Sequence, residues 1–113
     1  MEDREERTIY CIAPSRDGPV KIGVANDTKK RLAQLQTGSD KLLTIFNEEI
    51  VRATHTLALE RLIHTQLGHK RLKGEWFDIN VEDAIAEVRF GIIRWESDDS
   101  LDRALRKKRL TKR

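Results

Sequence analysis

Three side chains that suit anion chemistry lie in the first third of the chain: the phenol of Tyr10, the amine of Lys21 and the guanidinium of Arg31. A guanidinium offers a planar fork of donors that fits a phosphate, and a nearby cation favours the ionised form of a phenol. The phenol, the amine and the guanidinium can act on the same anion only if the folded chain brings them together. We expect a hairpin followed by a helix to do so.

The hairpin is predicted from two short β-rich runs, 8–13 and 19–24, separated by a polar, glycine-containing turn. One register makes a single face apolar, and its pairs are Ile9 with Val24, Cys11 with Ile22, and Ala13 with Val20. On the other face Tyr10 then lies opposite Gly23 and diagonal to Lys21, roughly 5–7 Å away. Gly23 leaves space for the tyrosine ring or for a substrate.

The helix that carries Arg31 is predicted over 28–36, with Asn26 or Asp27 as its N-cap and Gly38 at its end. Arg31 lies at the edge of the buried leucine stripe of this helix. An arginine in that position either covers apolar surface with its stem or binds an anion.

The rest of the chain predicts a third strand over 41–51, a helix over 54–69, a helix over 81–95 and a last helix that begins at 98–100. The fold class is therefore α+β: a small three-stranded antiparallel sheet flanked by helices, with a C-terminal helical extension. We expect three parts: a flexible charged lead at 1–7, a folded domain at 8–96 and a basic helix or tail at 97–113.

Charge is distributed unevenly along the 113 residues, whose net charge is +3. Residues 103–113 hold seven of the 22 basic side chains and no acid, so the remainder carries 15 basic against 19 acidic side chains. Attraction to phosphate should therefore come from local basic patches and from the tail, rather than from a broad positive face. The candidate nucleic-acid contacts are a basic turn and the tail: Lys70, Arg71 and Lys73, then Arg106, Lys107, Lys108 and Arg109.

The single cysteine, Cys11, cannot form an internal disulfide and is expected to be a buried residue of a protein in the reducing cytoplasm. No apolar run approaches the length of a membrane span, and the acidic first residues do not resemble a secretory signal.

In their order and spacing, several short pieces resemble the GIY-YIG nuclease superfamily. The resemblance is closest to the phage and bacterial branch with KIG in place of YIG, the T5orf172-like proteins. The pieces that carry it are Ile9-Tyr10, Lys21-Ile22-Gly23, Arg31, the run 58–64 and the run 73–77.

This resemblance implies a GIY-YIG-like domain that acts as a metal-dependent DNA endonuclease with one Mg²⁺ (or Mn²⁺) and leaves a 3′-hydroxyl and a 5′-phosphate. Tyr10 would activate water, as a phenolate or by passing its proton on, if Lys21 or the metal lowers its pKa. Arg31 would bind the scissile phosphate. Glu60 matches the family's metal ligand, and His64, one turn later, would contact the phosphate or the water.

Alternatives remain open at this stage. Glu75 is a rival metal ligand to Glu60, and each candidate residue taken singly has an ordinary structural role. A non-catalytic DNA-binding protein that retains the fold is the second hypothesis, and a protein-interaction adaptor is the third. A carboxylate close to a phosphate repels it unless a metal intervenes, so Glu60 favours the nuclease. A partner protein that supplies specificity is also possible.

Overall fold

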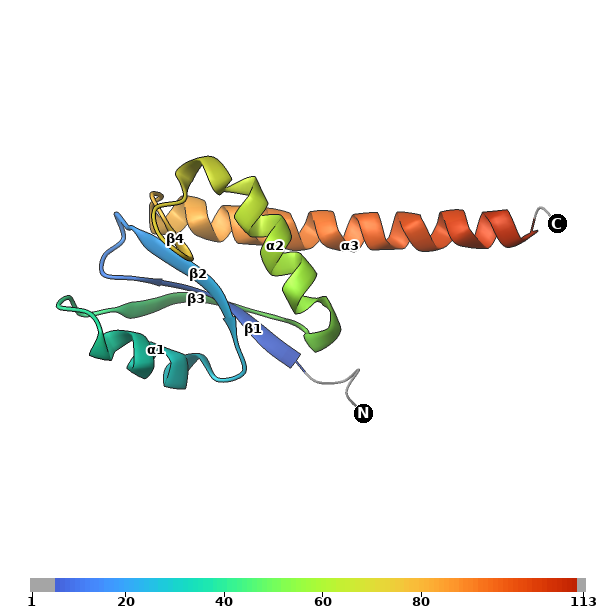
Figure 1. The fold of residues 1–113 in the computed structure, drawn as a ribbon. Helices are drawn as coiled ribbons and strands as arrows, with labels where there is room; N and C mark the ends of the chain where they lie inside the picture. The colour runs from blue at the N-terminus through green and yellow to red at the C-terminus, as the bar shows by residue number, and fades with distance from the viewer. Residues whose placement is uncertain (1–5, 112–113) are drawn as a thin grey trace.

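In the described part of the chain, the sheet has four antiparallel strands in the order β3-β1-β2-β4, and three helices accompany it (Figure 1). The computed structural model describes residues 6–111, and side chains as far as Ser97. The elements are β1 Glu6–Ala13, β2 Val20–Ala25, α1 Thr28–Thr37, β3 Thr44–Arg52, η2 Ala53–His55, α2 Thr56–Gln66, η3 Gly68–Lys70, β4 Trp76–Phe77 and α3 Val81–Thr111. The α+β class is confirmed, whereas the predicted count of three strands is wrong.

The hairpin of β1 and β2 has the predicted register, with Ile9 opposite Val24, Tyr10 opposite Gly23 and Cys11 opposite Ile22. Because side chains alternate across a strand, this register sends Ile9 and Cys11 to one face of the sheet and Tyr10 to the other.

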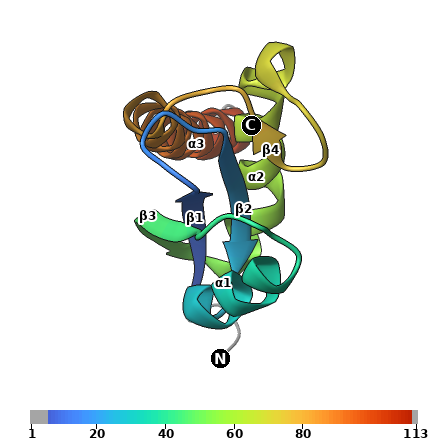
Figure 2. The same cartoon turned by 90° about the vertical axis from the view of Figure 1, so that its left-hand side faces the viewer.

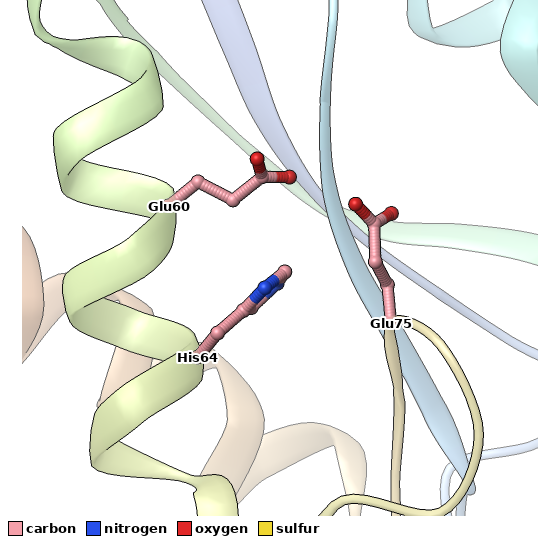
Figure 3. Close-up of side chains that lie close together, drawn as sticks. All are labelled: Glu60, His64 and Glu75. Atoms are coloured by element: carbon pink, nitrogen blue, oxygen red, sulfur yellow. The ribbon is translucent and has the colours of Figure 1, made fainter.

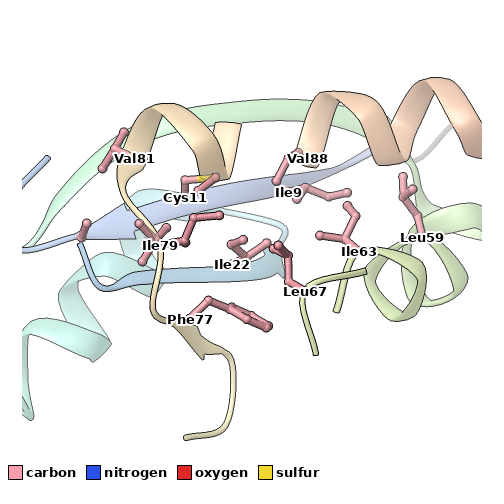
Figure 4. Close-up of a cluster of buried hydrophobic side chains, with 13 residues drawn as sticks. Ile9, Cys11, Ile22, Leu59, Ile63, Leu67, Phe77, Ile79, Val81 and Val88 are labelled. Carbon is pink, nitrogen blue, oxygen red and sulfur yellow. The ribbon is translucent and has the colours of Figure 1, made fainter. Parts of the chain in front are cut away.

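Both faces of the sheet are covered (Figure 2). On one face α2 and α3 pack over the apolar cluster drawn in Figure 4, which includes Ile22, Ile63 and Phe77. On the other face α1 covers a smaller cluster in which Tyr10 is fully buried. The hairpin is therefore the central layer of the structure, and its polar side chains are enclosed between the sheet and its helices.

The additional strand, β4, consists of Trp76 and Phe77 and pairs with the start of β2. Two residues are too few to show the alternation that identifies a strand in a sequence, and the pairing joins segments more than 50 residues apart. The Ile22 amide also donates to the Glu75 carbonyl at 3.1 Å. The missed strand thus places Glu75 beside the middle of β2.

The predicted third strand is β3, at the edge of the sheet next to β1. Helix α1 matches its prediction: the Asp27 side chain accepts from the Lys30 amide at 3.1 Å, and Gly38 is the C-cap. Helix α2 is shorter than predicted, because the residues on either side form single 3₁₀ turns, η2 and η3.

Helix α3 is continuous, whereas the sequence predicted a break near 98–100 (Figure 1). Aspartate and serine disfavour a helix interior only weakly, and 92–111 contains neither glycine nor proline. The Asn80 side chain caps the start, accepting from the Asp83 amide at 2.8 Å. Gly91 lets α3 approach α2 closely, since a Cβ there would lie 2.6 Å from Cγ1 of Ile63. In the described part of the chain no helix meets the length and apolarity that a membrane crossing requires.

Candidate active site

Tyr10 lies on the α1 side of the sheet, where its ring packs over its cross-strand partner Gly23. A Cβ at position 23 would lie 2.7 Å from Cζ of Tyr10 and 2.8 Å from Oε1 of Glu75. The absence of a side chain therefore makes room for both groups. Of the two uses predicted for this space, the tyrosine ring and a substrate, the ring occupies it.

Arg31 reaches the phenol from α1 and donates a hydrogen bond to its oxygen. Burial raises the pKa of Tyr10 above its ordinary value, and this outweighs the lowering by Arg31. The same contact raises the pKa of Arg31. The phenolate role predicted for Tyr10 requires a lowered pKa, whereas without a bound ion this pKa is raised. The cation at the phenol is Arg31 rather than Lys21.

Sequence reasoning missed Gln34, whose Oε1 accepts from Nη1 of Arg31 at 3.2 Å. The two residues are three apart on α1, a spacing that brings helix side chains together. The guanidinium thus lies between Tyr10 and Gln34, which restrict its orientation.

Glu60 and His64 project from α2 toward Glu75, which precedes β4 (Figure 3). Each offers one ligand atom, and the three atoms lie within 4.8 Å of one another. From the sequence, Glu60 and Glu75 are alternative metal ligands, whereas the structure places both carboxylates in the same cluster. No spacing rule could have paired them, because the pairing of β4 with β2 creates the proximity.

The Glu60 and Glu75 carboxylates of this cluster repel each other when both are ionised. Burial raises the pKa of Glu60 to about 7, and the charge of Glu75 and a hydrogen bond with it add to the effect. Lys21 acts in the opposite direction. Its Nζ lies 3.6 Å from Oε1 of Glu75 and 5.6 Å from the centre of the Trp76 ring. Lys21 therefore partly balances the carboxylate pair.

The His64 ring packs against Phe77, with ring centres 5.2 Å apart. Its Nε2 lies 2.9 Å from the carbonyl oxygen of Ile22. Five residues predicted for the site therefore lie around the middle of β2: Tyr10, Lys21, Arg31, Glu60 and His64.

Residues 7–93 match the T5orf172 domain, which is more than half of the chain. The chain belongs to the T5orf172 domain family. This is a family of nuclease-like, DNA-binding domains. In comparisons with curated proteins and with solved structures, nothing matches the chain.

The T5orf172 match includes the basic turn that leads into Glu75. Lys70, Arg71 and Lys73 are all exposed there, and the Arg71 guanidinium lies 5.5 Å from the centre of the Phe77 ring. The turn is thus an exposed basic approach to the carboxylates. The side chains of the predicted tail contacts lie outside the described residues: Arg106, Lys107, Lys108 and Arg109.

Proposed function

We propose that this T5orf172 domain is a metal-dependent DNA endonuclease of the GIY-YIG type that hydrolyses phosphodiester bonds with a single divalent ion. The observation that carries the proposal is the position of the Glu60, His64 and Glu75 donors, within 4.8 Å of one another. Next to them are the Tyr10–Arg31 pair and Lys21, which supply the donors and the positive charge that a phosphate needs.

The residues of the cluster fit a divalent cation. Burial raises the pKa of Glu60, and the charge of the facing Glu75 carboxylate raises it further, so the two ionised carboxylates destabilise each other at these partly buried positions. A cation between them relieves this repulsion, and carboxylate oxygens are the ligands that Mg²⁺ and Mn²⁺ prefer. Glu60 and Glu75 would hold the ion, which when bound would polarise a phosphate oxygen and acidify a bound water.

Arg31 is the proposed phosphate ligand. A guanidinium has five N–H donors, and only some of them are engaged by Tyr10 and Gln34. The others remain for the phosphate, and the contacts with Tyr10 and Gln34 orient them in advance. Because burial raises its pKa, the Tyr10 phenol stays protonated at neutral pH. Its proposed part is therefore to orient Arg31 and to relay a proton, rather than to act as a free phenolate.

DNA would approach along the exposed turn that contains Lys70, Arg71 and Lys73. The positive charges of this turn would bind backbone phosphates next to the Glu60–Glu75 carboxylates. These side chains read no bases in this proposal and only position the strand. A protein that merely binds DNA would gain nothing from Glu60 and Glu75, because two carboxylates repel a phosphate unless a cation lies between.

The test is cleavage of supercoiled plasmid and of branched DNA in Mg²⁺, in Mn²⁺ and in EDTA. We expect metal-dependent cutting that is lost in Arg31→Ala and retained in Lys30→Ala, an exposed cation one position away on α1. Glu60→Gln should abolish cleavage and spare DNA binding. Full cleavage by Glu60→Gln would reject the metal role. Salt-sensitive binding by all variants without cutting in any ion would support the non-catalytic DNA-binding protein instead.

A further inference from the structure

The orientation of His64 is determined by the backbone of the sheet. A carbonyl oxygen only accepts hydrogen bonds, so Nε2 of His64, 2.9 Å from the Ile22 carbonyl, must carry the hydrogen. The neutral ring then keeps its lone pair on Nδ1. Ile22 lies in β2, between β1 and β4, so its carbonyl is a rigid partner. Histidines that ligate metals commonly donate their other ring N–H to a backbone carbonyl in this way.

His64 is part of a donor set of mixed chemistry. One of its ring nitrogens lies within 4.8 Å of carboxylate oxygens of Glu60 and Glu75, and Figure 3 shows the three side chains converging on a common space. Because Nε2 is engaged by the Ile22 carbonyl, Nδ1 is the nitrogen that could bind a cation. Both Mg²⁺ and Mn²⁺ bind carboxylate oxygens, but Mg²⁺ retains its waters, whereas Mn²⁺, a transition-metal ion, accepts an imidazole nitrogen more readily. A site with two carboxylates and one imidazole therefore discriminates between these ions.

We propose that His64 is a metal ligand through Nδ1, with the Ile22 carbonyl holding its tautomer, and that this nitrogen makes the site prefer Mn²⁺ to Mg²⁺. The inference rests on the proposed function only for the presence of a divalent ion at this cluster. It assigns His64 to the metal rather than to the phosphate or the attacking water.

The first measurement is calorimetric titration of Mn²⁺ and of Mg²⁺ into the DNA-free protein. The wild type should bind Mn²⁺ about tenfold or more tightly than Mg²⁺. His64→Gln keeps an N–H that can reach the Ile22 carbonyl but removes the ring nitrogen that would face the metal. It should lower Mn²⁺ affinity about tenfold and leave Mg²⁺ affinity nearly unchanged. His69→Gln, an exposed histidine in η3, should match the wild type.

The second measurement is pulsed electron paramagnetic resonance of bound Mn²⁺, which detects a directly coordinated ¹⁴N. The nitrogen coupling should be present in the wild type and absent in His64→Gln. Its absence from the wild type, equal affinity for the two ions, or an unchanged affinity ratio in His64→Gln would overturn the inference.

These outcomes are separable from the fate of the nuclease proposal, because no DNA is present. A protein that shows the Mn–nitrogen coupling but cuts no DNA would reject the nuclease and keep the metal ligand. A protein that cuts DNA with Mg²⁺ but shows no coupling would keep the nuclease and reject His64 as a ligand.

Discussion

The ring of Tyr10 lies over Gly23, its partner in the pairing of β1 with β2, and occupies the space that a side chain at position 23 would need. This relationship places the phenol where Arg31 reaches it from α1. The same empty position accommodates the carboxylate of Glu75. A single glycine thus leaves room for both the Tyr10 phenol and the Glu75 carboxylate.

Gly23→Ala is expected to displace the Tyr10 ring. The added methyl group overlaps the ring in a buried cluster, and overpacking of this kind costs about 1–3 kcal/mol. Urea denaturation should show that loss in the free energy of unfolding, together with reduced DNA cleavage. Gly68→Ala is the matched control, because a Cβ there meets nothing within 4 Å. Equal stability of Gly23→Ala and the wild type would contradict the packing described for Tyr10.

Lys21→Met should destabilise the protein by about 1 kcal/mol, mainly by removing the cation that balances Glu75 and Glu60. The effect is modest because the Glu75 side chain is 35% exposed. A double-mutant cycle with Glu75→Gln measures the interaction directly, and we expect a coupling of about 0.5–1 kcal/mol. Additive effects of the two substitutions would show that Lys21 and Glu75 are not coupled.

The hairpin and α1 could be predicted because their signals are local. The polarity of facing residues determines the register around Tyr10, and Asp27 and Gly38 mark the ends of α1 by their own chemistry. The approach of Arg31 to Tyr10 followed from these two elements.

The parts that sequence reasoning missed depend on long-range contacts. Strand β4 forms because Trp76 and Phe77 pair with β2, and two residues are too few to show the alternation of polarity that predicts a strand. The proximity of the Glu60 and Glu75 side chains depends on the same pairing of β4 with β2. The break predicted near 98–100 failed for a different reason: residues that favour a helix start are tolerated inside a helix already propagating from Val81.

The raised pKa of Glu60 predicts a stability that depends on pH. The folded state holds a proton on Glu60 up to about pH 7, whereas the unfolded chain releases it near its ordinary value of 4.5. Between these pH values the folded state binds more protons, so the free energy of unfolding should fall as the pH rises. Glu60→Gln should remove this part of the fall.

Urea denaturation from pH 4 to 8 in EDTA measures the effect as the difference between wild type and variant. Glu82→Gln, which is exposed in the first turn of α3, serves as the control and should follow the wild type. A Glu60→Gln curve parallel to the wild type across the whole range would show that Glu60 titrates alike in both states.

Cys11 should be unreactive in the folded protein. Burial in the main core raises the pKa of its thiol to about 12, so about one molecule in 10⁴ carries the thiolate at pH 8. The aromatic disulfide reagent DTNB should therefore modify it at the rate of global unfolding in buffer and rapidly in urea. Prompt modification in buffer would show that the strand-to-helix packing opens locally.

The basic end of the chain should contribute affinity for DNA rather than cleavage chemistry. Residues 103–113 hold seven cations and no acid, and each phosphate contact that is lost reduces the slope of log K against log salt by about 0.9. Glutamine at Arg106, Lys107, Lys108 and Arg109 removes four of these charges and retains good helix formers. We expect weaker binding with a shallower salt slope, and cleavage that returns to the wild-type rate at saturating protein. The triple glutamine variant at Lys70, Arg71 and Lys73 provides the comparison, since it removes charge beside the carboxylates instead. An unchanged salt slope in the tail variant would show that the C-terminal end of α3 makes no contact with the DNA backbone.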